Sequence, residues 1–388
     1  MQDLLWLLLP VAAASGWWAA RRSQKKQSNR ACFDVSSDYF KGLNFLLNEQ
    51  PDKAIEVFLR MAEVDKDTAE THLALGSLFR RRGEVDRAIR IHQNLIARPT
   101  LSSEQRALAL FELGEDYMKA GWLDRAEHLF LELLELKAMV SSSLGRLIEI
   151  YQQEQDWQKA IEISQQYDSE TSSNSGLVVA HYYCELAEKA LKSGDQSLFN
   201  RHIEQAFQHD SNCTRASILM ANKEKRAKNY SRAIQYYKQV IHQDAAYLPK
   251  IIAPLKECYI KEGQEQEISI FLDEALQKYD GITPVLHKAD EILAQQGESE
   301  AISFMVAQIK NKPSVRGLQW LIELNLSKSE GKVEENLIVL SDLMKTLLNN
   351  KAVYECHHCG FNGKSMHWQC PGCKQWSTIK PIKGVVAE

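Results

Sequence analysis

The sequence predicts an all-α repeat protein with a membrane helix at its N-terminal end and a small metal-binding hairpin at its C-terminal end. Three observations carry this prediction: an uncharged run near the N-terminus, a period of 34 residues through most of the chain, and two paired-cysteine motifs in the last 35 residues. Only 9 prolines interrupt the 388 residues. Because proline breaks a helix interior, this favours helices joined by short connections.

The composition excludes several classes of protein. The 47 Lys+Arg residues are balanced by 51 Asp+Glu residues, so no broad basic surface predicts a nucleic-acid partner. The hydrophobic content of 44% argues against a disordered chain. Eight cysteines are few for a secreted disulfide scaffold of this length.

The uncharged run covers the 17 residues from Leu4 to Ala20. As a helix it would span about 26 Å, close to the roughly 30 Å of a bilayer core. Tryptophans lie near both ends of the run and a basic cluster follows it at once, which predicts that the following chain lies on the cytoplasmic side. We therefore expect a transmembrane anchor at residues 1–20 and a basic juxtamembrane linker at residues 21–34.

Two alternatives to the anchor remain open. A cleaved signal peptide would carry its positive charges before the apolar run, whereas here they follow it. A buried helix of a soluble domain could also be apolar on all sides, but the adjoining basic cluster suits an anchor better.

The repeat extends from about residue 35 to residue 350. An alanine recurs after a glycine-centred turn, and 34 residues separate Ala54 from Ala88 and Ala126 from Ala160. In the preceding helix a glycine recurs with an aromatic residue three positions later. The recurring residues are Ala54, Ala88, Ala126, Ala160 and Ala233 after the turn, and Gly42, Gly76 and Gly114 with Phe45, Phe79 and Tyr117 before it. This pattern is typical of tetratricopeptide repeats.

We expect about nine helix–turn–helix units at residues 35–350, of which the last three keep the turn glycine (Gly263, Gly297 and Gly331) and lose the rest of the pattern. They begin near Val35, Ala69, Ala107, Ser141, Ala180, Thr214, Pro249, Thr283 and Gly317. One unit cannot bury its apolar face alone, so neighbours stack into a superhelix. Its concave surface typically holds a peptide.

The run Arg80, Arg81 and Arg82 ends the first helix of one unit. Cations there complement the helix dipole, so a solvated helix end is the first expectation and a docking site for a partner the second.

The tail at residues 351–388 predicts a metal site. Its cysteines follow the pattern C-x2-C, ten residues, C-x2-C, and they are Cys356, Cys359, Cys370 and Cys373. Two such knuckles on a hairpin bring four thiolates to one tetrahedral ion. Because so short a segment cannot bury a sufficient core, the ion would supply much of its folding energy.

The spacing leaves the identity of the ion open between iron and zinc, and two disulfides are a remote alternative. We expect His357, His358 and His367 to be surface residues, since four thiolates already complete the site. We expect Cys184, Cys213 and Cys258 to be small buried residues, and Cys32 is a further isolated cysteine.

The sequence favours binding over catalysis. It contains neither an HExxH nor a GxSxG motif. The segment Gly363-Lys364-Ser365 resembles the end of a phosphate-binding loop, but His358 stands where the required glycine should be. We expect a protein that is not an enzyme.

Taken in order, the anchor, the repeats and the four-cysteine tail resemble the lipopolysaccharide assembly protein B family of bacterial inner-membrane proteins. The resemblance covers essentially the whole chain. The stretches that carry it are LLLPVAAASGWW at 7–18, SLFRRRGEVDRAIRIHQNLI at 77–96, HYYCELA at 181–187, CHHCGF at 356–361 and WQCPGCKQWSTIKPIKG at 368–384.

The resemblance implies a rubredoxin-like tail that binds iron or zinc through the four cysteines. A full rubredoxin is longer and has glycine where this chain has Lys374, so the resemblance favours a structural metal over electron transfer. It also implies a single-pass protein of the inner membrane with its bulk in the cytoplasm.

For function, the resemblance implies an adaptor that promotes degradation of the lipid A deacetylase LpxC by the membrane protease FtsH. A lipopolysaccharide-sensing inner-membrane protein would modulate it. Two alternatives stay open: a scaffold for lipopolysaccharide assembly without a proteolytic role, and a redox protein whose tail passes electrons.

Overall fold

The computed structural model describes residues 40–387, apart from 43, 46, 47, 49, 65–68, 327–329 and 350. The predicted anchor, the basic linker and Cys32 lie outside these residues. Within the described part of the chain, no helix is both long enough and apolar enough to cross a membrane.

The chain divides into two compact units, residues 1–173 and 174–388. The division falls in the four-residue link between the helices Trp157–Thr171 and Gly176–Ser193. We describe each unit by itself.

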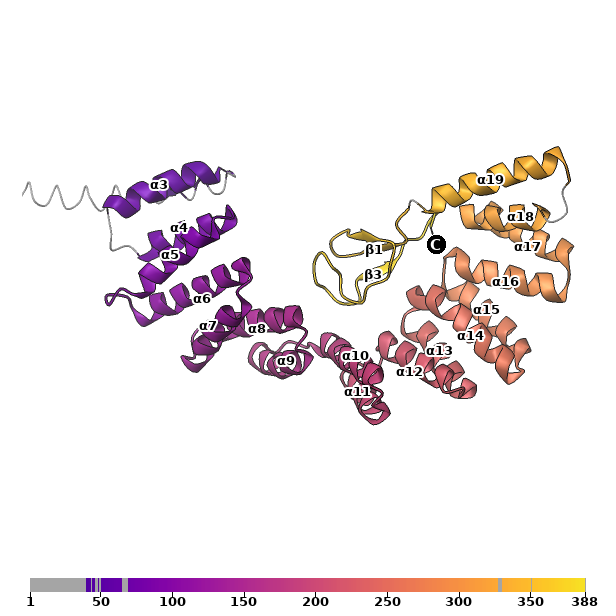
Figure 1. The fold of residues 1–388 in the computed structure, drawn as a ribbon, viewed down its shortest axis with the longest axis horizontal. Coiled ribbons are helices and arrows are strands. Elements are labelled where there is room, and N and C mark those ends of the chain that lie inside the picture. Colours follow the sequence, from indigo (N-terminus) through magenta and orange to yellow (C-terminus); the bar gives the residue numbers. More distant parts are fainter. Residues whose placement is uncertain are drawn as a thin grey trace, which may run out of the picture. The chain divides into compact units, whose positions relative to one another are not determined.

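The first unit consists of antiparallel helix pairs preceded by α3 (Figure 1). Its helices are α3 (Pro51–Val64), α4 (Ala69–Arg81), α5 (Val85–Ile96), α6 (Ser103–Ala120), α7 (Leu123–Glu135), α8 (Val140–Glu154) and α9 (Trp157–Thr171).

The second unit continues the helix pairs and ends in a small sheet. Its first helices are α10 (Gly176–Ser193), α11 (Gln196–His209), α12 (Thr214–Arg226), α13 (Tyr230–Gln243), the 3-10 turn η1 (Ala245–Tyr247), α14 (Leu248–Glu262) and α15 (Glu265–Lys278). The remaining elements are α16 (Ile282–Gln295), α17 (Glu298–Asn311), α18 (Val315–Leu326), α19 (Lys332–Asn349), β1 (Tyr354–Cys356), β2 (Asn362–Gly363) and β3 (Ile379–Pro381).

The predicted repeat array is confirmed. From Ala69 onward, each first helix of a pair begins within four residues of a predicted unit start. Every alanine that defined the period is fully buried, namely Ala54, Ala88, Ala126, Ala160 and Ala233. At the turns, Gly121 (φ 78°) and Gly263 (φ 71°) adopt the left-handed conformation that ends α6 and α14.

The helical glycines of the period mark close approaches between paired helices. A Cβ atom at Gly114 would lie 2.7 Å from the ring of Phe130, and one at Gly42 would lie 2.6 Å from Phe58. In the helix pair formed by α4 and α5, His92 takes the place of these phenylalanines. A Cβ atom at Gly76 would lie 2.3 Å from the His92 ring. A side chain at any of these positions would therefore force the neighbouring ring to move.

His92 can be buried because the next helix pair supplies a polar partner. Its Nδ1 lies 2.5 Å from Oδ2 of the buried Asp116 in α6. Arg80 donates to Oδ1 of the same carboxylate at 2.7 Å and ion-pairs with Glu112. The expectation of a solvated helix end is therefore wrong for Arg80, whose side chain links two successive helix pairs. The sequence pattern does not reveal which acidic residues the next helix presents.

A repeated cation–aromatic contact joins the two helices of four successive pairs. In each pair the basic residue just before the buried alanine lies over the recurring aromatic ring of the first helix. The contacts are Lys53–Phe45 at 5.8 Å, Arg87–Phe79 at 5.6 Å, Arg125–Tyr117 at 5.8 Å and Lys159–Tyr151 at 5.0 Å. Such contacts stabilise by about 0.5–1 kcal/mol each at exposed sites. The eight-residue spacing of cation and ring is a signal that the sequence analysis missed.

The tail forms an antiparallel sheet in the order β2-β1-β3. Tyr354 of β1 lies opposite Gly363 of β2, and Cys356 lies opposite Ile379 of β3. The tail thus contains a hairpin, as predicted, whose strands β1 and β2 flank the first knuckle, and β3 pairs with the other edge of β1.

Candidate metal centre and its docking surface

The two cysteine knuckles share the same pattern of backbone hydrogen bonds. In the first, Cys356 N–H donates to the carbonyl of Phe361 and Gly360 N–H donates to that of Cys356, at 2.8 and 2.9 Å. In the second, Cys370 and Lys374 make the equivalent bonds to Gln375 and Cys370, also at 2.8 and 2.9 Å.

The residue that follows each knuckle has a left-handed backbone, with φ 74° at Gly360 and φ 61° at Lys374. Lys374 therefore adopts a conformation that favours glycine. Gly372 in the second knuckle contributes in another way: a Cβ atom there would lie 3.4 Å from the Sγ of Cys359. It leaves room for the sulfur.

The structure brings together the four predicted ligands. The Sγ atoms of Cys356, Cys359, Cys370 and Cys373 all lie within 4.8 Å of one another. Two pairs lie closer, at 3.7 Å for Cys356–Cys373 and 3.6 Å for Cys359–Cys370. A tetrahedral ion about 2.3 Å from each sulfur requires sulfur separations of about 3.8 Å. The cluster therefore fits one metal ion held by cysteine thiolates.

The electrostatics of the cluster also fit a cation. Burial would raise the pKa of the Cys356 thiol, but Thr378 Oγ1 at 3.3 Å and the backbone N–H groups of Cys359 and His358 lower it to about 6. At Cys373 a backbone bond from Gln375 lowers the pKa, yet burial and the other three sulfurs raise it to about 12. The site therefore stabilises the thiolate form of Cys356 on its own. Four thiolates so close together repel one another, and a positive ion among them offsets this repulsion.

The three neighbouring histidines stay outside this cluster. His357, His358 and His367 are all exposed, and among the described residues the only group placed to hold a metal contains the four cysteines alone. All cysteines of the described part are free thiols, so the alternative of two disulfides is not realised.

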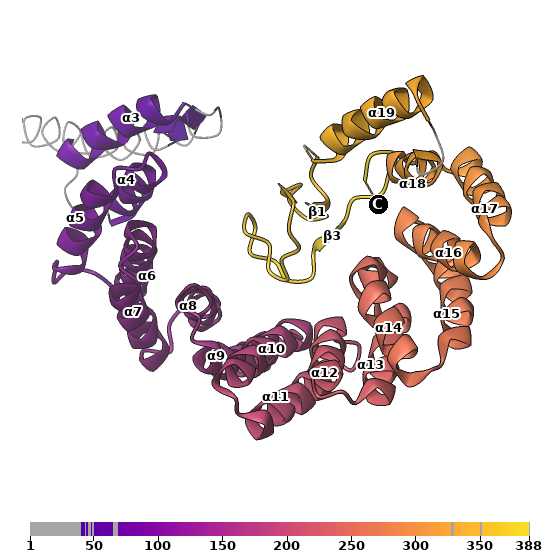
Figure 2. The same cartoon turned by 45° about the vertical axis from the view of Figure 1, so that its right-hand side comes forward.

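The metal-binding tail packs against the helices of the second unit (Figure 2). Two tryptophans make the contact. Trp376 stacks on His181 of α10, with ring centroids 5.0 Å apart, and meets Tyr182 edge-on at 5.8 Å. Trp368 lies 4.8 Å from the ring of Tyr247 in η1. We call these helix residues, with Arg215 and Lys250, the docking surface.

His181 is held neutral within this surface. Its Nε2 lies 2.7 Å from Ser377 Oγ, and its side chain is 3% exposed. Burial is the main cause that lowers the pKa of His181 to about 3, and the charges of Arg215 and Lys380 add to the shift. An aromatic stack with a neutral imidazole therefore persists throughout the physiological pH range.

Cations complete the contact. Arg215 of α12 and Lys250 of α14 lie over the Trp368 ring at 5.8 and 5.4 Å. Lys380 of β3 pairs with Asp244 and donates to the hydroxyl of Tyr247 at 3.1 Å. Burial would lower the pKa of Lys380, but Tyr247 and Asp244 raise it. Near the end of the chain, the carbonyl of Val385 accepts a hydrogen bond from the N–H of Val315 in α18, at 2.7 Å.

Sequence reasoning placed the ligands but missed the docking surface. The segment HYYCELA at 181–187 was noted only as a resemblance. Its buried His181 and Tyr182 both contact Trp376. Contacts between residues nearly 200 positions apart leave no periodic signal in one sequence.

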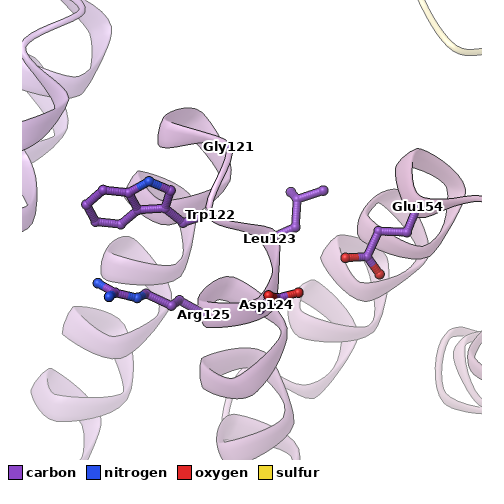
Figure 3. Close-up of a pocket in the computed structure, with 6 residues that line it drawn as sticks. All are labelled: Gly121, Trp122, Leu123, Asp124, Arg125 and Glu154. Atoms are coloured by element: carbon purple, nitrogen blue, oxygen red, sulfur yellow. The ribbon is translucent and has the colours of Figure 1, made fainter.

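The first unit carries a separate hollow of about 440 Å³ at the turn between α6 and α7 (Figure 3). Trp122 is 44% exposed there, with the guanidinium of Arg125 4.8 Å from its ring. Asp124 and Glu154 line the other side. The preceding turn has a similar hollow at residues 83–90 with Glu84 in place of Trp122. Exposed tryptophan and arginine are the residue types that most often dominate protein–protein affinity.

The fold and the site define a tetratricopeptide-repeat protein that carries a rubredoxin-type metal-binding domain. The family model for the rubredoxin metal binding domain matches residues 354–381, and that for the tetratricopeptide repeat matches residues 71–105. The C-terminal part of a repeat protein from Cytophaga hutchinsonii superposes with a TM-score of 0.39 at 13% identity, over 69% of this chain and 98% of that one.

Full-length relatives give the family. The chain is 39% identical to lipopolysaccharide assembly protein B of Escherichia coli over 386 residues, which is 99% of both chains. It is 34% identical to the protein of the same name from Haemophilus influenzae over 392 residues, 98% of both chains. This chain belongs to the lipopolysaccharide assembly protein B family.

Proposed function

We propose that this chain is an adaptor tethered to the cytoplasmic face of the bacterial inner membrane, where it limits lipopolysaccharide synthesis by promoting degradation of LpxC by FtsH. The observation that carries the proposal is the match to lipopolysaccharide assembly proteins along the whole chain. The repeat array supports a role in binding rather than catalysis, because stacked helix pairs present long surfaces suited to peptides.

The tether gives the adaptor its physical advantage. The uncharged run at residues 4–20 and the basic residues behind it support a single membrane helix with the array in the cytoplasm. A scaffold held beside a membrane protease raises the effective concentration of any protein that the scaffold binds. A lipopolysaccharide-sensing protein of the same membrane could then regulate the array by direct contact.

The ion in the tail has a structural role in this proposal. Its four sulfurs come from a segment with a small buried core of its own, and the same segment presents Trp368 and Trp376 to the docking surface. Zinc and iron both suit four thiolates. Purified protein distinguishes them, since iron gives a red solution with visible absorption and zinc a colourless one.

The proposal is tested by the half-life of LpxC. Escherichia coli cells depleted of their own relative are supplied with this chain, and LpxC is followed after protein synthesis is stopped. We expect the chain to shorten the half-life in cells with active FtsH and to have no effect when FtsH is inactive. A normal lipopolysaccharide level with an unchanged LpxC half-life would instead indicate a scaffold without a proteolytic role.

A further inference from the structure

Two buried cysteines outside the metal site lie side by side in the second unit. The Sγ atoms of Cys184 and Cys213 are 3.9 Å apart, and the residues are 0% and 3% exposed. Cys184 lies within α10, whereas Cys213 is the N-cap residue of α12, so the pair joins two successive helix pairs. Both are free thiols.

The pair lies directly behind the docking surface for the metal-binding domain. Cys184 is one helical turn from His181, which stacks on Trp376. Cys213 is two residues from Arg215, whose guanidinium lies over Trp368. A change in the distance between the two sulfurs therefore acts on both elements that hold the two tryptophans.

The surroundings differentiate the two thiols. A hydrogen bond from Cys184 and the backbone N–H of Ala216 lower the pKa of Cys213, although burial opposes the shift. Burial is the main cause that raises the pKa of Cys184. Arg215, which ion-pairs with Glu185 and Glu188, also favours the thiolate form of both. Cys213 is thus the nucleophile and Cys184 the resolving thiol.

We propose that Cys184 and Cys213 form a thiol–disulfide pair that a hydroperoxide closes, and that closing it loosens the metal-binding domain from the docking surface. The Cys213 thiolate attacks the peroxide O–O bond and becomes a sulfenic acid, with one molecule of water leaving. The Cys184 sulfur then attacks the sulfenic sulfur and releases a second water. Two thiols and one hydrogen peroxide thus give one disulfide and two waters, and a dithiol reductant reverses the reaction.

Closure acts on the docking surface because the two sulfurs are held in packed helices. A disulfide requires a sulfur separation of about 2.05 Å, and the part of the 3.9 Å gap that side-chain rotation does not close is closed by a shift of the start of α12 against the middle of α10. His181 and Arg215 shift with them, and the two tryptophan contacts lose their fit. Tight packing transmits such displacements, since side chains at a close-packed interface have little room to adjust.

The test uses the full-length chain in detergent, loaded with zinc and exposed to hydrogen peroxide. After tryptic digestion without reductant, we expect a linked pair of peptides that contain Cys184 and Cys213 and that is two hydrogen atoms lighter than their sum. Zinc release to a coloured chelator should be faster in the oxidised wild type than in oxidised Cys184→Ala, on the order of threefold. Direct oxidation of the metal-bound thiolates contributes equally to both.

Two further variants control the comparison. Cys213→Ser should fold normally, because serine is a good N-cap residue, and should behave like Cys184→Ala. Cys258→Ser removes a buried thiol of α14 that lacks a second thiol beside it in the described structure, and should behave like the wild type. Absence of the linked peptides would overturn the proposal, and so would linked peptides with zinc release equal to that of Cys184→Ala.

Discussion

Glycine positions in the first unit show how single residues set the spacing of paired helices. Gly42, Gly76 and Gly114 recur in register, and each lies against a ring from the partner helix. The sequence showed the recurrence of these glycines. It did not predict that one of the rings would be His92, because a histidine becomes a core residue only where a neighbouring unit supplies an acid such as Asp116.

Gly114→Ala should destabilise the array, because its Cβ would lie 2.7 Å from Phe130. Overpacking of this kind costs about 1–3 kcal/mol. Urea unfolding followed by far-ultraviolet circular dichroism measures the loss. Gly145→Ala is the matched control: it also lies within a helix, but its Cβ would be 3.9 Å from the nearest atom, Tyr167. It should be neutral or slightly stabilising, and equal destabilisation by both variants would contradict the packing explanation.

Lys374→Gly should stabilise the metal-binding domain. Lys374 has φ 61°, a conformation that is costly for any residue with a Cβ atom. Part of the gain is offset by the greater freedom of glycine in the unfolded chain, which leaves roughly 0.5–1 kcal/mol. The measurement is the rate of zinc release to a chelator, expected to fall. Gln375→Gly, an exposed neighbour outside the positive-φ region, should raise that rate.

At the scale of elements, the three-stranded tail depends on its ion and on the helices beneath it. Its buried core consists of Cys356, Cys370 and Ile379, which is too little apolar surface for independent stability. The knuckle spacing predicted this dependence on metal. It could not predict β3, which pairs with β1 but lies outside the two knuckles, or the docking surface, which depends on contacts with distant helices.

Cys370→Ser combined with Cys373→Ser should unfold the tail and leave the array folded. The double variant removes half of the ligands of an ion that supplies the folding energy. Fluorescence of Trp368 and Trp376 should shift to that of exposed indole, while the helical circular dichroism changes little. Zinc content per chain provides the control. Retention of one ion and of buried tryptophan emission would contradict the proposed ligand set.

At the scale of the whole molecule, the chain combines three parts that differ in how well one sequence reveals them. The helix pairs were predictable to within a few residues because the same 34-residue pattern recurs many times along the chain. The four metal ligands were predictable because a short spacing motif defines them. The ion pairs of Arg80 and the packing of Trp376 on His181 were not, since each depends on a pairing that occurs once.

The proposed function depends most heavily on tethering, by which the chain would hold LpxC near a membrane protease. The most direct measurement compares LpxC levels in depleted cells that receive either the full chain or residues 21–388, expressed equally. We expect the shortened chain to stay folded and soluble yet fail to lower LpxC, and an unrelated membrane helix in place of residues 1–20 to restore the effect. Equal lowering of LpxC by the untethered array would contradict it.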